Sequence, residues 1–345
     1  MYRILFHLLL SVHISLAAKW AIDGSCDLIA TADKGIGQNS FIPGTDELKE
    51  AVKEGISMAE SAVLVMSYHK DDQHVKDMLK LVLGEGAEYQ SKFDAFKRTF
   101  ENVMGFDRDH AVARPMDPDW QETMTNKDVM IFCSNDRLQQ TVPGTTLYFD
   151  QSMKDTRYFS VELEKDAPRG RCHSTEYNLE STAGLAMAFT TASDRYNKEA
   201  YIKAPKPKRI EDFGFPRENI ACSIDLCNWF MHRSLLQGWP RISTDRVKQT
   251  QQPGFRGGIV SFVTPVDGLR NTGLTMLHEL THTVQGGRLS DIRDLPPGTP
   301  SCYGWRCIQD LKDPTNSDNV AMLGLALHLW TMGYYVDQDG NVKDK

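Results

Sequence analysis

Two histidines four residues apart in an almost uncharged stretch constrain this chain more than any other feature. His278 and His282 fall within residues 272–285, where Glu279 is the only charged side chain. The apolar and neutral residues of this stretch predict a buried helix, and glycines follow where such a helix would end. Residues four apart share one face of a helix, so both imidazoles can bind one metal ion.

The residue between the histidines adds a chemical reason for a metal. Glu279 would sit beside the ion, where a metal-bound water needs a base, and this His-Glu-x-x-His spacing is typical of zinc peptidases. The alternative is a buried helix whose histidines only satisfy hydrogen bonds in the core. A buried glutamate between two histidines is costly without a cation, so we favour a site for one Zn²⁺ ion.

A third ligand must come from outside the motif, because a catalytic zinc has three protein ligands and one open position. No glutamate follows Glu279 in the chain. Gln285 and Arg288 stand where an extended motif would need glycine and histidine, and His328 lies in an apolar run. Aspartate is therefore the remaining ligand type.

Two aspartates follow the helix closely enough to turn back toward the ion. Asp291 and Asp294 lie nine and twelve residues beyond His282. We prefer Asp294, because it leads into Leu-Pro-Pro-Gly, which forms a rigid turn. Asp291 stays a serious alternative, and either carboxylate can instead be a solvated turn residue paired with Arg288 or Arg293.

Residues 129–330 resemble the fungal deuterolysin family of aspartate-zincins. That family carries His-Glu-x-x-His, then Gly-Thr-x-Asp-x-x-Tyr-Gly, then Asn-Ala-Asp-Asn or Asn-Ala-Asp-Ser at the start of a helix. This chain has the first motif, Gly-Thr-Pro-Ser-Cys-Tyr-Gly at 298–304 and Asn-Ser-Asp-Asn at 316–319. The second element is one residue short, and proline or serine stands where the family has aspartate. The metal carboxylate is therefore expected from the preceding loop.

The resemblance implies a secreted zinc metalloendopeptidase that hydrolyses protein or peptide substrates. In that scheme His278, His282 and an aspartate hold the ion, while Glu279 moves a proton from the water to the leaving amine. One alternative is a non-catalytic secreted zinc-binding protein on the same fold, which would keep the ligands without needing Glu279. Another is a secreted interaction protein that has the fold and no metal.

Two further residues take a role through the resemblance. Tyr303 would reach the cleft and donate a hydrogen bond to the tetrahedral oxyanion. It can equally be a half-buried loop aromatic with a solvated hydroxyl. Asp318 would brace the site, and it also suits the N-cap of a helix over 320–330.

The first 17 residues have the features of a secretory signal peptide. Arg3 precedes a mostly apolar run over residues 4–16, and Ala17 suits the cleavage site. This run is shorter than the roughly 20 residues that span a bilayer, so we expect no membrane attachment after cleavage. We expect the mature chain to be a secreted, extracellular monomer, and its net charge of −7 before cleavage argues against a nucleic acid partner.

Seven cysteines in an exported chain indicate disulfides rather than metal ligands. Cys222 with Cys227 and Cys302 with Cys307 are attractive local pairs, although spacing alone does not determine connectivity. An odd number leaves at least one thiol or a bridge between chains.

Hydrophobic periodicity separates a helical part from a part richer in strands. Apolar residues recur every three or four positions early in the chain, whereas short β-prone runs bounded by turn residues follow. We expect helices at 46–66, 75–83, 89–104 and 182–196, and strands at 129–133, 145–149 and 157–163.

This order predicts an α+β, zincin-like fold for residues 18–345. The N-terminal helical part covers about 45–110, and the catalytic core covers about 125–335. An upper lobe of sheet and helices would end in the metal helix, and a smaller, mainly helical C-terminal lobe would donate the third ligand.

Overall fold

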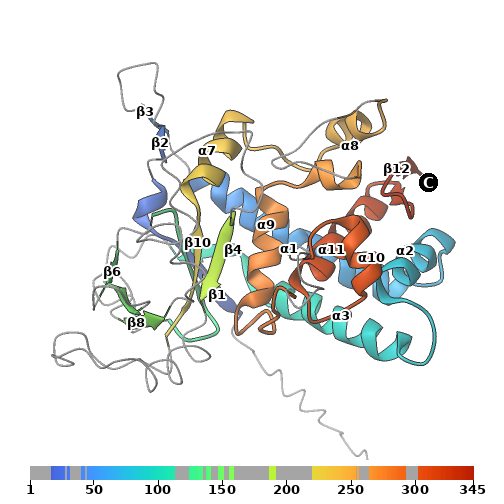
Figure 1. Ribbon diagram of the computed structural model, residues 1–345, viewed down its shortest axis with the longest axis horizontal. Helices are drawn as coiled ribbons and strands as arrows, with labels where there is room; N and C mark the ends of the chain where they lie inside the picture. Colours follow the sequence, from blue (N-terminus) through green and yellow to red (C-terminus); the bar gives the residue numbers. More distant parts are fainter. Residues whose placement is uncertain are drawn as a thin grey trace, which may run out of the picture.

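The structure of this protein is a computed structural model, which describes residues 17–27, 29–31, 40–42, 45–112, 124–134, 137–140, 147–150, 155–158, 186–191, 220–253, 255, 264–292 and 302–345. Within these ranges the chain forms eight α-helices and a mixed sheet of five strands, which confirms an α+β protein. Figure 1 shows helix α9 between the sheet and a group of helices that includes α10 and α11. The expected signal peptide, except its last residue, lies outside the described residues.

Three helices occur where hydrophobic periodicity predicts them. Helix α1 spans Thr45–Tyr68, α2 spans Gln73–Leu83 and α3 spans Tyr89–Met104. Phe96 and Phe100, on the aromatic face of α3, are fully buried. The apolar stripe of each helix therefore faces the core, as an amphipathic pattern requires.

The main sheet has the strand order β4-β1-β5-β10-β9. Strand β1 pairs in parallel with β4 and β5, β10 pairs in parallel with β5, and β9 runs antiparallel to β10. Every residue of β5 and β10 is buried, as expected for parallel strands covered on both faces. Among the described strands, β9 thus forms one edge of this sheet. The strands are Ala18–Ile22 (β1), Phe106–Val112 (β4), Val129–Phe132 (β5), Ala188–Thr191 (β9) and Cys222–Leu226 (β10).

Strand β9 corrects the helix predicted over 182–196, as far as that range is described. Thr190 pairs with Ile224 of β10, and Thr191 pairs with Ser223. Threonine is β-branched and fits a pleated surface, so pairing with a buried neighbouring strand outweighs the helical composition of this segment.

Three smaller sheets complete the described strands. The strand expected at 145–149 occurs as β7, which begins two residues later than predicted. Strand β8 shares residues 157 and 158 with the strand expected at 157–163, and the rest of that range lies outside the described residues. Strands β7 and β8 form a three-stranded antiparallel sheet with β6, and two hairpins pair β2 with β3 and β11 with β12. The bounds are Ile29–Thr31 (β2), Ser40–Ile42 (β3), Leu138–Gln140 (β6), Leu147–Asp150 (β7), Asp155–Tyr158 (β8), Tyr334–Val336 (β11) and Val342–Asp344 (β12).

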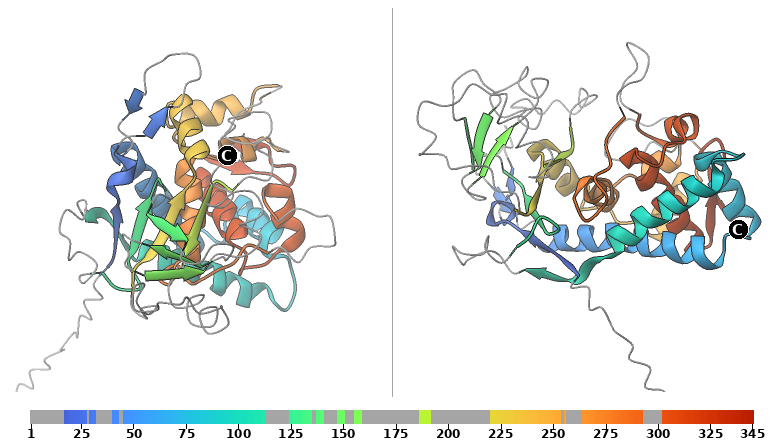
Figure 2. Two further views of the ribbon diagram at one scale, coloured as in Figure 1. Left: turned by 60° about the vertical axis from the view of Figure 1, so that its left-hand side comes forward. Right: turned by 90° about the horizontal axis from the view of Figure 1, so that it is seen from below.

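Helix α9 lies between α1 and α11, where glycines allow close approach. A Cβ added at Gly55 of α1 would stand 2.8 Å from the carbonyl oxygen of Gly273, and one at Gly324 of α11 would stand 2.8 Å from Cδ2 of Leu277. Figure 2 shows α1 running beneath α9. The later helices are Asn228–Leu236 (α7), Thr244–Thr250 (α8), Thr272–His282 (α9), Trp305–Leu311 (α10) and Ser317–Thr331 (α11).

Two disulfides join described cysteines. One links Cys26 to Cys133, and the other links Cys302 to Cys307, as expected from their spacing. The other local pair is wrong, because Cys222 carries a thiol and Cys227 is bonded to another cysteine. Cys222 opens strand β10, and five residues of extended chain place Cys227 about 16 Å away, beyond the reach of a disulfide.

These two disulfides fit an extracellular protein. Across the described ranges, no helix combines the length and apolar character needed to cross a bilayer.

Candidate metal centre

Helix α9 starts as predicted and ends earlier, at the second histidine. The side chain of Asn271 caps the N-terminus by accepting the backbone N–H of Leu274 at 2.8 Å. The helix ends at His282 because Thr283 is extended, with φ −70° and ψ 165°. The chain therefore turns away directly after His282, and the next loop can return over the site.

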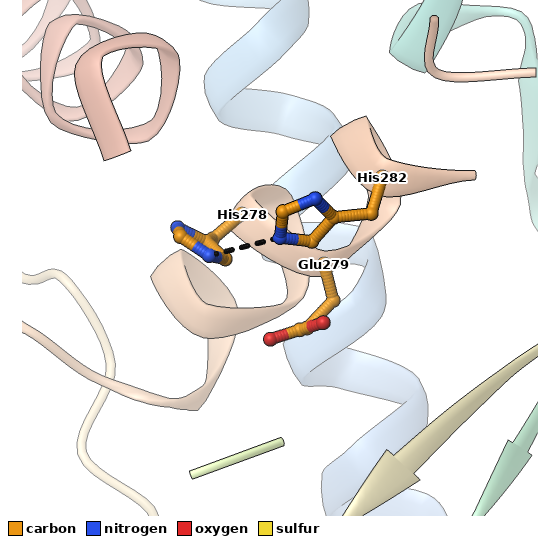
Figure 3. A group of neighbouring side chains, drawn as sticks. All are labelled: His278, Glu279 and His282. Atoms are coloured by element: carbon orange, nitrogen blue, oxygen red, sulfur yellow. Dashed lines mark hydrogen bonds between the residues drawn. The ribbon is translucent and has the colours of Figure 1, made fainter. Parts of the chain in front are cut away.

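The two histidines of the motif converge on one point. His278 and His282 approach to 3.2 Å between their Nε2 atoms, and Figure 3 shows both rings on the same side of α9. Glu279 completes a group in which one possible ligand atom from each side chain lies within 4.8 Å of the others. His278 and Glu279 are buried, as expected for a helix in the floor of a site. This group is able to hold a metal ion.

Asp291 brings a carboxylate to the same point. Its Oδ1 atom lies 3.1 Å from Nε2 of His278 and 3.7 Å from Nε2 of His282. Asp294, the aspartate preferred from the sequence, lies outside the described residues. Asp291 is thus the member of this pair whose position is described, and it lies against both imidazoles.

Backbone hydrogen bonds hold Asp291 on both sides. The N–H of Ser290 donates to the carbonyl of Thr315 at 3.0 Å, and the N–H of Ile292 donates to Oδ1 of Asn316 at 3.0 Å. Both partners belong to the segment that leads into α11. The position of Asp291 is therefore set by contacts with a distant part of the sequence.

The spacing of these ligand atoms fits a metal ion. Zinc bonds of about 2.0–2.1 Å in a tetrahedron place neighbouring ligand atoms about 3.3 Å apart. The three separations among His278, His282 and Asp291 are 3.1, 3.2 and 3.7 Å. Oδ1 of Asp291 is also buried, and the nearer imidazole nitrogen, Nε2 of His278, faces it at 3.1 Å. A buried carboxylate oxygen facing two imidazoles needs a positive charge beside it, either a proton on an imidazole or a metal ion.

In both histidines Nδ1, the ring nitrogen that does not face the site, lies near an oxygen atom. Nδ1 of His282 lies 2.9 Å from the carbonyl oxygen of Leu289 and 3.1 Å from Oγ of Ser317. Since a carbonyl only accepts, Nδ1 carries the proton and Nε2 presents its lone pair to the site. Nδ1 of His278 faces Oδ1 of Asp318 at 3.6 Å. Such partners orient metal-binding histidines.

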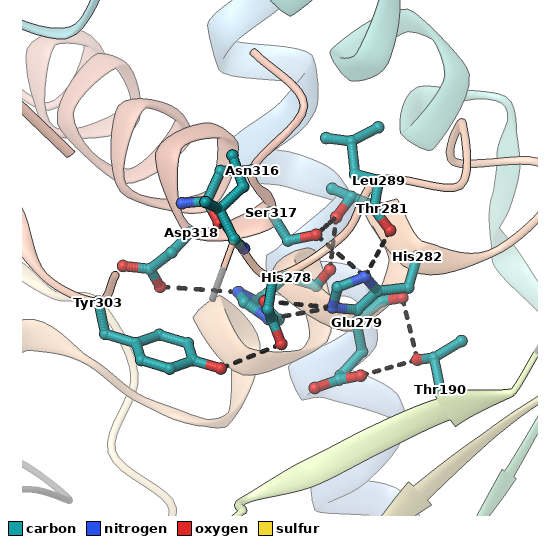
Figure 4. Close-up of polar contacts among 12 residues, drawn as sticks. Thr190, His278, Glu279, Thr281, His282, Leu289, Tyr303, Asn316, Ser317 and Asp318 are labelled. Atoms are coloured by element: carbon teal, nitrogen blue, oxygen red, sulfur yellow. Dashed lines mark hydrogen bonds and ion pairs between the residues drawn. The ribbon is translucent and has the colours of Figure 1, made fainter. Parts of the chain in front are cut away.

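Asp318 is held in place by a buried arginine. The guanidinium of Arg270 contacts both of its oxygens at 2.7 and 2.6 Å, and the N–H of Gly304 donates to it at 2.6 Å. The N-cap of α11 is Asn316, so the prediction that Asp318 caps this helix is wrong. Asp318 lies in the first turn, where its side chain turns toward His278 instead of toward its own helix (Figure 4).

The charges of the site favour a cation. Burial opposes charge on His278, but the carboxylate of Asp291 outweighs it and raises the pKa of His278 from 6.5 to about 10. Burial also opposes charge on Asp291, yet His278 holds the pKa of that carboxyl well below its usual range. Burial of Asp318 is outweighed by Arg270, which lowers the pKa of Asp318 to about 2. A metal ion would displace the proton that these carboxylates hold on His278.

Glu279 has a partner that the sequence did not reveal. Oγ1 of Thr190 lies 2.7 Å from Oε2 of Glu279 and 3.2 Å from its backbone carbonyl oxygen. Sequence reasoning placed Thr190 in a helix and gave it no role. No local motif marks this residue, because the contact depends on the pairing of β9 with β10.

Tyr303 lies at the site, as the resemblance implied. Its hydroxyl donates to Oδ2 of Asp291 at 3.0 Å, and its ring centroid is 5.9 Å from that of His278. The side chain is 46% exposed, so it covers the site from the solvent side. The Cys302–Cys307 disulfide closes the turn that carries it.

Comparison with protein-family models, with curated proteins and with solved structures yields no match to this chain. The described residues define an α+β protein with a His-Glu-His group, buried at His278 and Glu279, that could hold a metal ion.

Proposed function

We propose that this protein is a secreted zinc-dependent metalloendopeptidase of the aspartate-zincin kind, with His278, His282 and Asp291 as metal ligands. One observation carries the proposal: Oδ1 of Asp291 approaches both Nε2 atoms at separations that suit a tetrahedral ion. Asp291 replaces Asp294 as our preferred third ligand for the same reason.

In this proposal the ion, Glu279 and Tyr303 have separate roles in peptide-bond hydrolysis. A zinc ion held there would lower the pKa of a bound water toward about 7 and polarise a peptide carbonyl. Glu279 accepts the proton of the water and passes it to the leaving amine. Tyr303 is our candidate donor to the oxyanion, since its hydroxyl lies over the ligand carboxylate.

The position of the sheet supports a peptide as the substrate. Strand β9 forms the edge of the described sheet, and its Thr190 contacts Glu279. An extended peptide can pair with an edge strand through main-chain hydrogen bonds. A chain bound along β9 would therefore run past the proposed base.

Export is the second part of the proposal. The apolar N-terminal run supports a signal peptide, and the disulfides Cys26–Cys133 and Cys302–Cys307 suit an oxidising compartment. We propose that the mature chain is extracellular and begins near residue 18.

The experiment compares the protein with its Glu279→Gln variant after expression in an oxidising host. We expect both to contain about one zinc per chain by elemental analysis, since Glu279 is not a ligand in this proposal. Casein hydrolysis should fall by at least about a hundredfold in the variant, because general-base catalysis contributes about that much or more. Unchanged hydrolysis by Glu279→Gln contradicts the mechanism.

A non-catalytic zinc-binding protein is the second candidate. One observation favours it: the hydroxyl of Tyr303 donates its proton to Asp291. That proton is the one proposed above to stabilise the oxyanion. Stoichiometric zinc with no hydrolysis of casein or of a varied peptide library would support this candidate over the peptidase.

A further inference from the structure

The contact between Thr190 and Glu279 joins strand β9 to the last turn of helix α9. The single hydroxyl proton of Thr190 is shared between two acceptors of Glu279, Oε2 at 2.7 Å and the backbone carbonyl oxygen at 3.2 Å. Figure 4 shows the second carboxylate oxygen of Glu279 pointing away from Thr190. One side chain on β9 therefore fixes the backbone and the carboxylate of the same residue.

The end of α9 explains why the backbone carbonyl of Glu279 accepts this bond. In a longer helix that carbonyl would accept the N–H of Thr283, four residues on. The N–H of Thr283 donates instead to the carbonyl of Leu280 at 3.2 Å, because the helix ends at His282. Thr190 thus supplies a hydrogen-bond donor to a carbonyl that the early helix end leaves without its usual partner.

Strand alternation explains why Thr190 can reach the helix. Successive side chains of a strand point to opposite faces of the sheet. Thr190 of β9 bonds to α9, so its neighbour Thr191 points to the opposite face, where it is buried. The pairing of Thr190 with Ile224 of buried β10 sets this register.

We propose that Thr190 is a positioning residue for Glu279, an inference that rests on the function proposed above. By donating to Oε2, Thr190 keeps that oxygen occupied and turns Oε1 toward the water that is to be deprotonated. The same hydrogen bond ties Glu279 to the strand along which a substrate would pair. Thr190 therefore aligns the base with the peptide without touching the metal ligands.

The test uses two substitutions at Thr190 and a control on the same strand. Thr190→Val keeps the shape and removes the donor, whereas Thr190→Ser keeps the donor. Thr191→Val is the matched control on the opposite face. We expect Thr190→Val to lower kcat by about 10- to 100-fold with little change in KM, the size typical of an orienting partner. Thr190→Ser and Thr191→Val should stay near the starting activity, and zinc content should be unchanged in all three.

A crystal structure of metal-free Thr190→Val gives a readout that does not depend on activity. We expect the Glu279 carboxylate to leave its present position, and a carboxylate that stays in place would overturn the proposal. An equal loss of kcat in the Ser and Val variants would also overturn it. If the unmodified protein binds zinc but hydrolyses no peptide, the proposed function fails, and the position of Glu279 in the Val variant still decides the role of Thr190.

Discussion

Gly55 of α1 lies so close to Gly273 of α9 that an added Cβ would stand 2.8 Å from the Gly273 carbonyl oxygen and 2.9 Å from the backbone nitrogen of Leu277. These are backbone atoms, which cannot move aside as the end of a flexible side chain can. We predict that Gly55→Ala lowers the free energy of unfolding by about 1–3 kcal/mol, the usual cost of overpacking.

Urea unfolding of the protein, after a chelator has removed any bound metal, checks this prediction. Gly24→Ala is the matched control, because a Cβ there would meet only Oδ2 of Asp27 at 3.8 Å. Equal stability of the Gly55→Ala protein and the control would contradict a close crossing of α1 and α9.

The identity of the third ligand can be decided by substitution of each aspartate. Asp291→Asn should weaken zinc binding by more than the roughly 10- to 100-fold that loss of an orienting residue costs, because it removes a ligand charge. Asp294→Asn should leave binding nearly unchanged. Competition with a chromophoric chelator measures both affinities, and the reverse ranking would return the ligand role to Asp294.

The ion pair between Arg270 and Asp318 is buried, so the stability losses from substituting its two partners should not add up. Arg270→Met leaves a buried carboxylate without its partner and should cost about 3–5 kcal/mol of unfolding free energy. Adding Asp318→Asn to the same protein should restore part of that loss, because the uncompensated charge is removed. Urea unfolding of the two single variants and the double variant, all without metal, gives the coupling. Strictly additive losses would show that the pair does not act as a unit.

The metal-free protein should be most stable in mildly acidic solution. The folded state raises the pKa of His278 from 6.5 to about 10, so its contribution is complete below pH 6.5 and is lost as the pH rises toward 10. The pKa of Asp318 falls from 3.8 to about 2, so its contribution is present above pH 3.8 and is lost as the pH falls through 2. The melting temperature of the metal-free protein should therefore decline as the pH rises from 6.5 to 9.

The variant His278→Gln serves as the control for this pH dependence, since it should lose the decline above pH 6.5. Zinc must displace the same proton, so zinc affinity should rise with pH over the same interval. A zinc affinity that is constant from pH 6.5 to 9 would contradict the assigned protonation of His278.

The sequence allowed the first three helices and the His-Glu-His group of the site to be predicted. The periodicity of residues 46–104 reports burial along each helix, and the structure places α1, α2 and α3 accordingly. His278, Glu279 and His282 could be grouped because their proximity follows from helix geometry alone.

The remaining site depends on contacts that are distant in sequence. Local turn chemistry favoured Asp294, whereas the described position of Asp291 depends on hydrogen bonds from its neighbours to Thr315 and Asn316. Thr190 reaches Glu279 only because β9 pairs with β10. No spacing rule within one segment contains that information.

The clamping of Asp291 between the bonded N–H groups of Ser290 and Ile292 has a kinetic consequence. A carboxylate already fixed opposite two imidazoles requires no movement of residues 290–292 when an ion arrives. The rate of metal binding should then be limited by diffusion and dehydration of the ion, and not by a conformational change of the protein. The protein should therefore survive repeated chelation cycles without passing through an unfolded intermediate.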